Sequence, residues 1–383
     1  MSKRGFNLNV IAAAMRRRAE RLLGREQNYF LGTPPGLALS PSARHFADYE
    51  TVQPALRFSG QSQDVSRWQA ASRDKLTELS GYHREPKPPK VVNESTFPLS
   101  GGLSRRTVYL SARTGVDIPV HLIGPQGRQS RRPVMICLQG TNSGARLSWG
   151  EPRFPADHAL VGQGYDFAIQ AVKRGYLAIA IEQSCFGERA ERQIDPRSLA
   201  PCVDTTMHAI LLGRSLIGER GTDVSAVIDW LEAEHESLRI DVKNIHVMGH
   251  SSGGSVALFA AALDTRISAV LACGCVGYIR DTIGRRRDDQ GQNVIPGILN
   301  WLEMADIVGL VAPRPFVTVA GETDHIWPAG GCAAVIDETK SIYAKLNAAD
   351  RLLCVREPGG HKFRSDSSWR AFFSVVPAPD SGI

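Results

Sequence analysis

Short apolar runs alternate with helical stretches through most of the chain, beginning near Arg106. Eight of these runs are typical of strands: Thr107–Leu110, Ile118–Ile123, Val134–Leu138, Leu177–Ile181, Ile245–Met248, Ala269–Cys273, Pro315–Val319 and Leu352–Val355. Helical patterns separate most of them, notably Gly221–Glu234 and Ala333–Leu346. Because parallel strands need a crossover that is usually a helix, the alternation predicts an α/β fold with a mostly parallel sheet covered on both faces.

The first hundred residues lack this alternation and are rich in Pro, Arg and Ser. Asn9–Leu23 is a basic amphipathic pattern without the apolar core of a secretory signal. An Arg-rich targeting peptide, a helix lying on a surface, and a helix packed on this chain or a partner subunit all fit it. Val65–Leu79 has apolar residues at near-helical spacing and stops at Gly81, and Glu85–Lys90 follows as a Pro/Lys linker.

Composition excludes several classes of protein. Hydrophobic residues make up 43% and charged residues 22% of the chain, as in an ordinary globular protein. No run of about 18 apolar residues is present, so we expect no membrane span. The formal charge of +6 is mild and shows no basic stripe with interleaved aromatics, which argues against a nucleic-acid partner. The seven cysteines form no C-x-x-C pair, and several fall in apolar runs, so we expect a reducing, cytoplasmic location.

The segment Gly249–Gly254 (GHSSGG) joins a β-rich run, Asn244–Met248, to a stretch of small, helix-compatible residues, Ser255–Leu263. In that context G-x-S-x-G is typical of a nucleophile elbow, a strained turn in which only small flanking residues fit. Such a turn holds the hydroxyl of Ser251 above the sheet. The G-x-S-x-G pattern by itself often arises by chance, and an ordinary Gly/Ser loop is the alternative interpretation. The flanking strand and helix favour the nucleophile.

A serine hydroxyl needs a base to remove its proton and an acid to orient that base. Asp324 lies in the loop after the Pro315–Val319 run, and His361 lies in the Gly-rich loop after the Leu352–Val355 run. The order serine, acid, histidine, with each residue after a strand, is the order expected downstream of such an elbow. We therefore predict that Asp324 and His361 complete a triad with Ser251.

Three other side chains compete for these roles. Glu322 is an alternative acid, although it sits closer to the end of the strand. His325 is an alternative base, but a base directly adjacent to its own orienting acid would face poor geometry. His250 lies inside the elbow, where we expect it to shape the pocket wall.

Acyl transfer also requires an oxyanion hole, that is, hydrogen-bond donors placed where negative charge develops. One donor is expected to be the backbone N–H of Ser252. The second is expected from the loop after the Val134–Leu138 run, where Gln139, Gly140 and Thr141 are all candidates. Small residues in that loop allow a close approach of backbone to substrate.

The region from about Asp64 to Phe373 resembles the α/β-hydrolase superfamily, in its acetyl-xylan-esterase-like and dienelactone-hydrolase-like branch. Beyond the triad, the resemblance rests on Cys137–Gly140 (CLQG), Lys173–Tyr176 (KRGY), Phe186–Arg189 (FGER), Leu212–Arg214 (LGR), Ile295–Gly297 (IPG), Asp306–Leu310 (DIVGL) and Ala312–Pro315 (APRP). The helical pattern at Val65–Leu79 also matches a helix that commonly precedes the catalytic domain in this branch.

The resemblance implies a Ser-His-Asp mechanism on esters, with short acyl groups favoured and with no metal or organic cofactor. The change of pattern near Arg106 separately predicts an N-terminal helical extension and linker over residues 1–100 and a catalytic domain over 101–383. An amidase, a peptidase or an acyltransferase would use the same triad, and a non-catalytic binding protein on this fold is a further alternative. The expected partner is a small-molecule ester, and the N-terminal arm is a candidate for contact between copies of the chain.

Further residues are candidates for shaping specificity. The long polar connection Gly277–Trp301 lies where insertions often form a lid, and it contains three consecutive arginines beginning at Arg285. Glu182, at the end of a predicted strand, and His208 with Arg214 are candidates for lining the cleft. For each of these three, a structural salt bridge or hydrogen bond is at least as good an interpretation.

Overall fold

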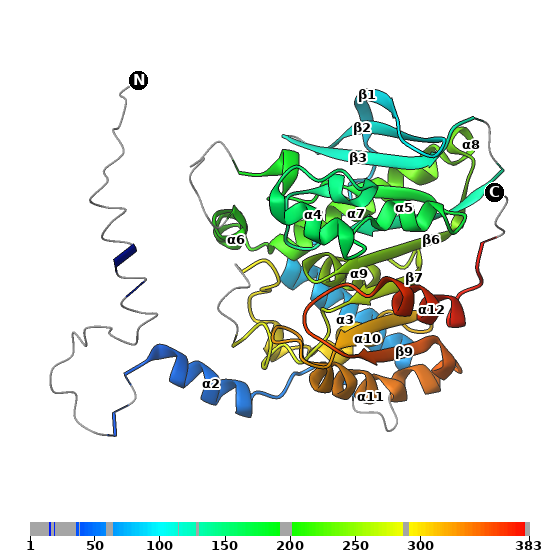
Figure 1. Ribbon diagram of the computed structural model, residues 1–383. Helices are drawn as coiled ribbons and strands as arrows, with labels where there is room; N and C mark the ends of the chain where they lie inside the picture. The colour runs from blue at the N-terminus through cyan, green and yellow to red at the C-terminus, as the bar shows by residue number, and fades with distance from the viewer. Residues whose placement is uncertain are drawn as a thin grey trace. The chain divides into compact units, whose positions relative to one another are not determined.

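A nine-stranded sheet organises the computed structural model, which describes residues 15, 16, 19, 36, 37, 39–58, 64–113, 115–127, 130–191, 201–285 and 291–379 (Figure 1). The strands are β1 Lys90–Pro98, β2 Leu103–Arg113, β3 Val116–Pro125, β4 Arg132–Leu138, β5 Leu177–Ile181, β6 Ile240–His250, β7 Ile267–Cys273, β8 Phe316–Gly321 and β9 Leu352–Glu357. Their order in space is β1-β2-β3-β5-β4-β6-β7-β8-β9. The three pairs from β1 to β5 are antiparallel and all the others are parallel, so the predicted α/β architecture is confirmed.

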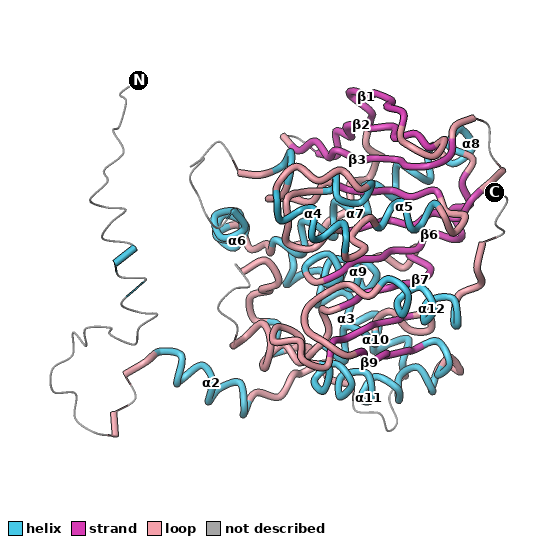
Figure 2. Tube along the Cα trace, in the orientation of Figure 1, coloured by secondary structure: helices cyan, strands magenta, loops and turns pink. Residues whose placement is uncertain are grey.

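Helices connect the strands and cover both faces of the sheet (Figure 2). They are α3 Val65–Ser80, α4 Pro155–Gly162, α5 Phe167–Val172, α6 Pro201–Leu211, α7 Leu216–Ala233, α8 His235–Leu238, α9 Ser252–Leu263, α10 Met304–Gly309, α11 Ala329–Lys345 and α12 Ser365–Val375. Short 3-10 turns occur at Ala145–Trp149, Gly187–Arg189, Ile298–Asn300 and Ala349–Arg351. None of the helices in the described ranges is long and apolar enough to cross a membrane.

Strand β4 shows how one sequence run serves two cores. Val134, Ile136 and Leu138 belong to an apolar cluster shared with α3, α7, α9, α10 and α11. Met135 and Cys137 belong to a second cluster, shared with α5 and α12. Because successive side chains of a strand point to opposite faces, a continuous apolar run is what a strand covered on both faces requires.

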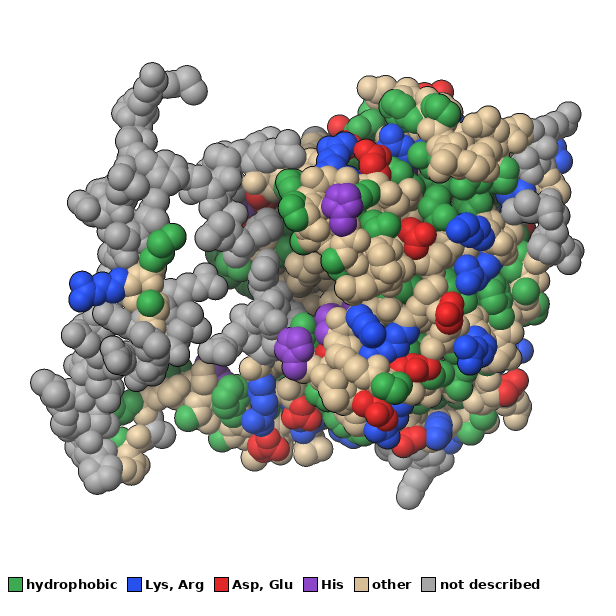
Figure 3. Space-filling view, viewed as in Figure 1, with side chains coloured by type: hydrophobic (Ala, Val, Ile, Leu, Met, Phe, Trp, Pro, Cys, Tyr) green, Lys and Arg blue, Asp and Glu red, His purple; other side chains and the backbone are tan. Residues whose placement is uncertain are grey.

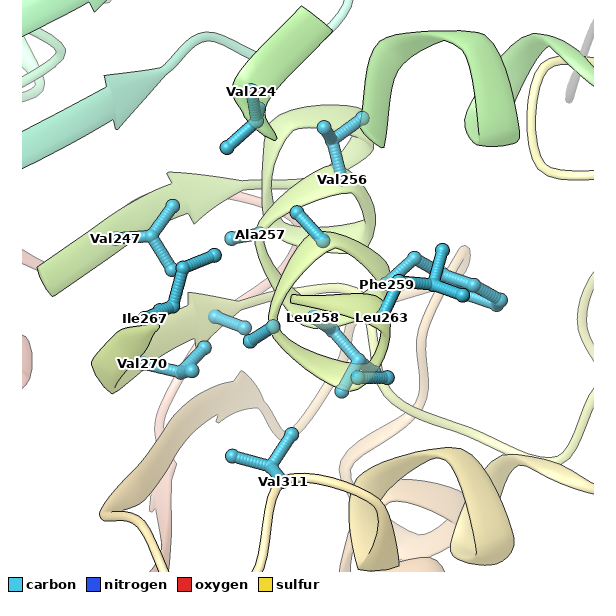
Figure 4. Close-up of a cluster of buried hydrophobic side chains, with 14 of the residues drawn as sticks. Val224, Val247, Val256, Ala257, Leu258, Phe259, Leu263, Ile267, Val270 and Val311 are labelled. Atoms are coloured by element: carbon cyan, nitrogen blue, oxygen red, sulfur yellow. The ribbon is translucent and has the colours of Figure 1, made fainter. Parts of the chain in front are cut away.

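Helix α9 lies in the middle of the first cluster, and every residue along its length is buried (Figure 4). Phe259 and Leu258 pack there with Val224 of α7 and Val270 of β7. Each fully buried side chain of this size contributes about 1.5–3 kcal/mol. The helix that begins immediately after Ser251 is therefore held rigidly.

The chain divides into two compact units, Met1–Thr51 and Val52–Ile383. In the first unit the structure describes helix α2, Pro41–Thr51. The helix expected at Asn9–Leu23 lies mostly outside the described residues. On the face of the chain shown in Figure 3, acidic and basic side chains are interspersed.

Helix α3, predicted from sequence, forms and belongs to the second unit. Asp64 caps it by accepting hydrogen bonds from the N–H groups of Ser66 and Arg67, and Gly81 ends it with a φ of +68°. Arg73 donates to the carbonyl of Ala262 in α9. Strand β1 was not predicted from the sequence, and it pairs with β2 within the same unit. Residues 52–100 therefore belong to the unit that carries the sheet. A catalytic domain beginning at residue 101 stays a prediction.

Candidate active site

Ser251 occupies the turn between β6 and α9 with a φ of +57° and a ψ of −126°. Such a conformation is strained for a residue with a Cβ. The flanking glycines make the turn sterically feasible. A Cβ on Gly249 would lie 2.3 Å from the carbonyl oxygen of Gly253, and one on Gly253 would lie 2.1 Å from that of Leu138. The strand–turn–helix geometry expected of a nucleophile elbow is thus present at the predicted position.

The three residues of the predicted triad lie together. His361 Nε2 is 2.9 Å from Ser251 Oγ, and His361 Nδ1 is 2.8 Å from Asp324 Oδ2. Asp324 Oδ1 accepts the N–H groups of Ile326 and Trp327 at 2.8 and 2.9 Å. Burial opposes ionisation of Asp324, but these hydrogen bonds outweigh it and lower its pKa. A carboxylate accepting at Nδ1–H leaves Nε2 free to accept the proton of Ser251.

His250 forms part of the pocket wall behind the triad. Its ring is buried, lies 4.8 Å from the ring of His361, and places Nδ1 3.0 Å from the hydroxyl of Tyr165. Burial, reinforced by the neighbouring His361, lowers the pKa of His250 to about 3. His250 is therefore neutral at physiological pH.

The competing acid and base lie away from this geometry. Glu322 is exposed and its carboxylate is 3.5 Å from the guanidinium of Arg356. His325 is also exposed. The structure brings neither side chain to Ser251, and it brings Asp324 and His361 there.

Ser252 is the first residue of α9 and lines the pocket at Ser251. The first N–H groups of a helix have no partner within the helix, and the helix dipole places partial positive charge there. The backbone N–H of Ser252 thus has the properties that its predicted role in an oxyanion hole requires.

The loop after β4 provides the opposite side of the pocket. A Cβ on Gly140 would lie 3.3 Å from Ser251 Cβ, so the backbone at this position passes close to the nucleophile. Gly140 and Thr141 both line the pocket. The Gln139 side chain is buried, and its Nε2 donates a hydrogen bond to Ser148 Oγ. The backbone carbonyl of Gln139 accepts a hydrogen bond from Gln183 Nε2 at 2.5 Å. Gln139 thus holds the loop from behind, which leaves Gly140 and Thr141 as the better-placed candidates for the second donor.

Two residues of the pocket had no signal in the sequence. Gln292 and Asn293, from the connection between β7 and α10, line the pocket at Ser251. Gln292 Nε2 donates to Thr141 Oγ1 at 3.0 Å, and Gln292 Oε1 accepts from Ser252 Oγ at 2.8 Å. The predicted lid segment Gly277–Trp301 therefore contributes side chains to the pocket, although residues 286–290, including two of the three consecutive arginines, lie outside the described residues.

Two pockets meet at the oxyanion loop. The catalytic pocket, of about 300 Å³, is lined by Gly140, Thr141, Asn142, Leu160, Tyr165, His250, Ser251, Ser252, Gln292, Asn293, Ile326 and His361. A neighbouring pocket, of about 470 Å³, is lined by Arg105, His121, Thr141, Asn142, Ser143, Arg146, Trp149, Arg153, Phe154, Glu182, Cys185, Phe186, Gly187, Glu188 and Ala190. Thr141 and Asn142 line both, so the two pockets are adjacent.

Glu182 lines the neighbouring pocket, beside rather than at the nucleophile. Its carboxylate accepts the N–H of Ala145 at 2.9 Å. A Cβ on Gly187 would lie 2.1 Å from one carboxylate oxygen and a Cβ on Gly144 would lie 3.0 Å from the other, so glycines make room for the group. Burial raises the pKa of Glu182 to about 7.

His208 and Arg214 line neither of the two pockets described above, and their place in the cleft stays a prediction. His208 lies on the exposed side of α6. Arg214 is exposed after the end of α6, and its guanidinium is 3.7 Å from the carboxylate of Glu219. A surface ion pair, one of the two interpretations open from sequence, therefore describes Arg214.

The described residues contain no group of three or more His, Cys, Asp or Glu side chains arranged to hold a metal ion. The expectation that the reaction needs no metal stays a prediction.

A model of the Abhydrolase family matches residues 46–328 of this chain. YtaP of Bacillus subtilis (strain 168), named as a presumed hydrolase, is 28% identical over 200 residues, which are 51% of this chain and 62% of YtaP. The chain thus spans less than two thirds of the length of this curated relative.

Solved structures share the architecture over nearly the whole chain. A presumed acetyl xylan esterase from Bacteroides fragilis NCTC 9343 has a TM-score of 0.66 and 19% identity, covering 91% of this chain and 92% of its own. A glucuronoyl esterase from Solibacter usitatus has a TM-score of 0.59 and 14% identity, covering 85% and 97%. At these identities the likeness establishes the α/β-hydrolase fold, and with the family match it confirms the resemblance seen in the sequence.

Proposed function

The chain belongs to the Abhydrolase family, and from this premise we propose that it is a carboxylic ester hydrolase that works through Ser251, His361 and Asp324. Ser251 Oγ attacks the ester carbonyl while His361 Nε2 takes its proton. His361 then protonates the departing alcohol, leaving an acyl-enzyme that water hydrolyses by the same route. Asp324 holds the imidazole in the tautomer that this sequence needs.

The observation that carries this proposal is the continuous hydrogen-bond chain from Asp324 through His361 to Ser251 Oγ. It ends in a pocket, at a serine in the strained conformation of a nucleophile elbow. Distances of 2.8 and 2.9 Å are within the range at which proton transfer takes place. A serine on an ordinary loop has neither the strain nor the base.

We further propose that the acyl group is short and that the alcohol lies in the neighbouring pocket. The catalytic pocket of about 300 Å³ must also contain the reacting carbonyl, which leaves little room for a long chain. The neighbouring pocket offers the aromatic rings of Trp149 and Phe154 together with charged groups such as Glu182 and Arg105. Such a mixture suits a polyhydroxylated alcohol, and relatives of this fold are named acetyl xylan and glucuronoyl esterases.

The test compares the wild-type protein with Ser251→Ala in the hydrolysis of p-nitrophenyl acetate. We expect kcat to fall by at least about 10⁴-fold, because removal of a triad nucleophile leaves only binding and the oxyanion hole. A fluorophosphonate should label wild-type Ser251, as located by mass spectrometry, and should not label the variant. Full turnover by a pure, folded Ser251→Ala preparation would overturn the proposal.

A reducing, cytoplasmic location is also proposed. All seven cysteines are free thiols in the structure, and Cys332 Sγ and Cys354 Sγ lie 3.7 Å apart without a covalent bond. Protein isolated from its source cells under thiol trapping should show seven titratable thiols after denaturation. Recovery of a disulfide between these two cysteines would contradict the proposed location.

A further inference from the structure

Arg220, on α7, is buried directly behind the predicted oxyanion hole. Its side chain is 1% exposed. Nη1 donates to Ser252 Oγ at 3.0 Å and to Gln292 Oε1 at 3.1 Å, while Nη2 donates to the carbonyl of Ser184 at 2.7 Å. The guanidinium also lies 4.7 Å from the centre of the Phe186 ring. Apart from one thiol contact, all its polar partners are neutral oxygen atoms.

Within the described ranges, no carboxylate lies within ion-pair distance of Arg220. The thiol contact is with Cys202, 3.6 Å from Nη2, whose pKa is raised by its hydrogen bond to Cys185, so Cys202 is uncharged. The same hydrogen bond, together with the charge of Arg220, lowers the pKa of Cys185 to about 6, so a Cys185 thiolate partly balances Arg220 although no hydrogen bond joins the two groups.

Two other arginines with little exposed surface have carboxylate partners. Arg146 faces Asp157 at 3.0 Å, and Arg189 faces Asp223 at 2.7 Å. In the described residues, Arg314 instead donates to backbone carbonyl oxygens and to no carboxylate. A buried charge without a counter-ion is costly, and proteins normally avoid it. Unlike Arg314, Arg220 contacts two residues that line the candidate catalytic pocket, Ser252 and Gln292, so its charge lies where it can act on the reaction.

The contacts of Arg220 lead to both sides of the pocket. Ser252, whose N–H is the first predicted oxyanion donor, also donates its hydroxyl to Gln292 Oε1 at 2.8 Å. Gln292 then donates from Nε2 to Thr141 Oγ1 at 3.0 Å, in the loop predicted to supply the second donor. The guanidinium therefore fixes both donor-bearing segments through neutral side chains that polarise in its field.

We propose that Arg220 is the positioning residue of the oxyanion hole, holding Ser252 and Gln292 in place and supplying the positive field that the developing oxyanion needs. This inference rests on the proposed function. As the bond from Ser251 Oγ to the carbonyl carbon forms, the π pair of the carbonyl moves onto its oxygen and the hydroxyl proton moves to His361. Arg220 gains and loses no proton. Its fixed charge favours the tetrahedral state over the uncharged ester.

The first test is Arg220→Met, which removes the charge and keeps most of the volume. For p-nitrophenyl acetate we expect kcat to fall about 10- to 100-fold with KM changed less than twofold, somewhat below the loss of a direct oxyanion donor. The affinity for an aryl trifluoromethyl ketone, which adds to Ser251 as a tetrahedral oxyanion, should fall by the same factor. The thermal midpoint should fall less than in a variant that leaves carboxylates unpaired, because only neutral acceptors, the carbonyl of Ser184 and Gln292 Oε1, lose a donor.

Arg266→Met is the matched control. Arg266 is partly buried and faces Asp264 and Asp229, each at 2.6 Å. Its removal leaves carboxylates unpaired, so we expect a lower thermal midpoint with unchanged kcat. The two variants should therefore show opposite signatures.

Gln292→Glu tests the same role of Arg220 if Arg220→Met does not fold. Gln292→Glu places a carboxylate where Oε1 now lies, 3.1 Å from Nη1, and so supplies the missing counter-ion. A purely structural Arg220 predicts a stabler protein with intact kcat. The electrostatic role predicts that kcat and ketone affinity fall together while stability is kept or raised. If folded Gln292→Glu keeps the wild-type kcat and ketone affinity while Ser251→Ala is inactive, the role of Arg220 is overturned and the proposed function stands. If Ser251→Ala is active, the proposed function itself is overturned.

Discussion

The catalytic pocket has two walls that are built in different ways. The nucleophile wall, defined as Ser251, Asp324 and His361, is placed by backbone at the ends of β6, β8 and β9. The oxyanion wall, defined as the predicted donor-bearing residues Gly140, Thr141, Ser252 and Gln292 with Arg220 behind them, is placed largely by hydrogen bonds between side chains from four separate segments. We expect variants in the first wall to abolish the chemistry and variants in the second to weaken it by degrees.

Asp324→Asn should have the largest effect. An asparagine can present its amide N–H₂ toward His361 and so favour the wrong imidazole tautomer, for which a loss of about 10⁴-fold in kcat is typical. KM should change little, and circular dichroism should show an intact fold. Glu322→Gln, at the competing acid, is the control and should retain wild-type kcat; the reverse ranking of the two variants would assign the acid to Glu322.

Gly140→Ala probes the point where the two walls touch. The added Cβ would lie 2.9 Å from the carbonyl oxygen of His250 and 3.3 Å from Ser251 Cβ, so the loop must move away from the nucleophile. We expect kcat to fall about 100-fold, the magnitude for one lost oxyanion donor. Gly162→Ala is a matched control because nothing lies within 4 Å of its Cβ. Equal kcat in the two variants would show that the loop has no part in catalysis.

His246→Gln tests the electrostatics beneath the nucleophile wall. Burial lowers the pKa of His246 to about 4, below the 6.5 of the unfolded chain. Between these values the unfolded state binds the extra proton, so His246 costs the native protein stability as pH falls. The slope of unfolding free energy against pH, from urea titrations at pH 4.5 to 6.5, should drop by about 1.4 kcal/mol per pH unit in the variant. An unchanged slope would mean that His246 is charged in the native state.

Glu182→Gln tests the electrostatics beside the predicted oxyanion loop. Its effect on the pH dependence of stability should be opposite in sign to that of His246→Gln. The pKa of Glu182 is about 7 in the folded protein, against 4.5 when unfolded, so the native state binds the extra proton between these values. Stability contributed by this group is lost as pH rises from 4.5 to 7. The glutamine can still accept the hydrogen bond from Ala145 N–H. Between pH 5 and pH 8 the free energy of unfolding should therefore fall by up to about 3 kcal/mol less in the variant than in the wild type. Parallel pH curves for wild type and variant would refute the raised pKa.

The sequence predicted the nucleophile wall because each member carries a local signal. Gly249 and Gly253 indicate the turn at Ser251, and Asp324 and His361 each follow an apolar run that is typical of a strand. Eight of the nine strands were also found in this way. Strand β1 was missed because all its residues are exposed at the edge of the sheet, so it lacks an apolar face.

The oxyanion wall could be predicted only in part. Its loop was proposed from its small residues, but Gln292 lies 72 residues from Arg220 and nothing in either neighbourhood indicates that they meet. In addition, the residue type alone does not tell whether an arginine is buried or exposed. The sequence likewise did not indicate that His208 and Arg214 are exposed, because the side of α6 and of its following turn that faces solvent cannot be assigned from residue type.

The close contact between Gly253 and the carbonyl oxygen of Leu138 has a consequence for how activity is acquired. That contact joins α9 to the end of β4, so the elbow has its native surroundings only where the central strands are assembled. We therefore expect Ser251 to lack its base, His361, which lies 110 residues away in the sequence, until the sheet has formed. Recovery of esterase activity during refolding would report completion of the sheet centre, later than any signal from helix formation.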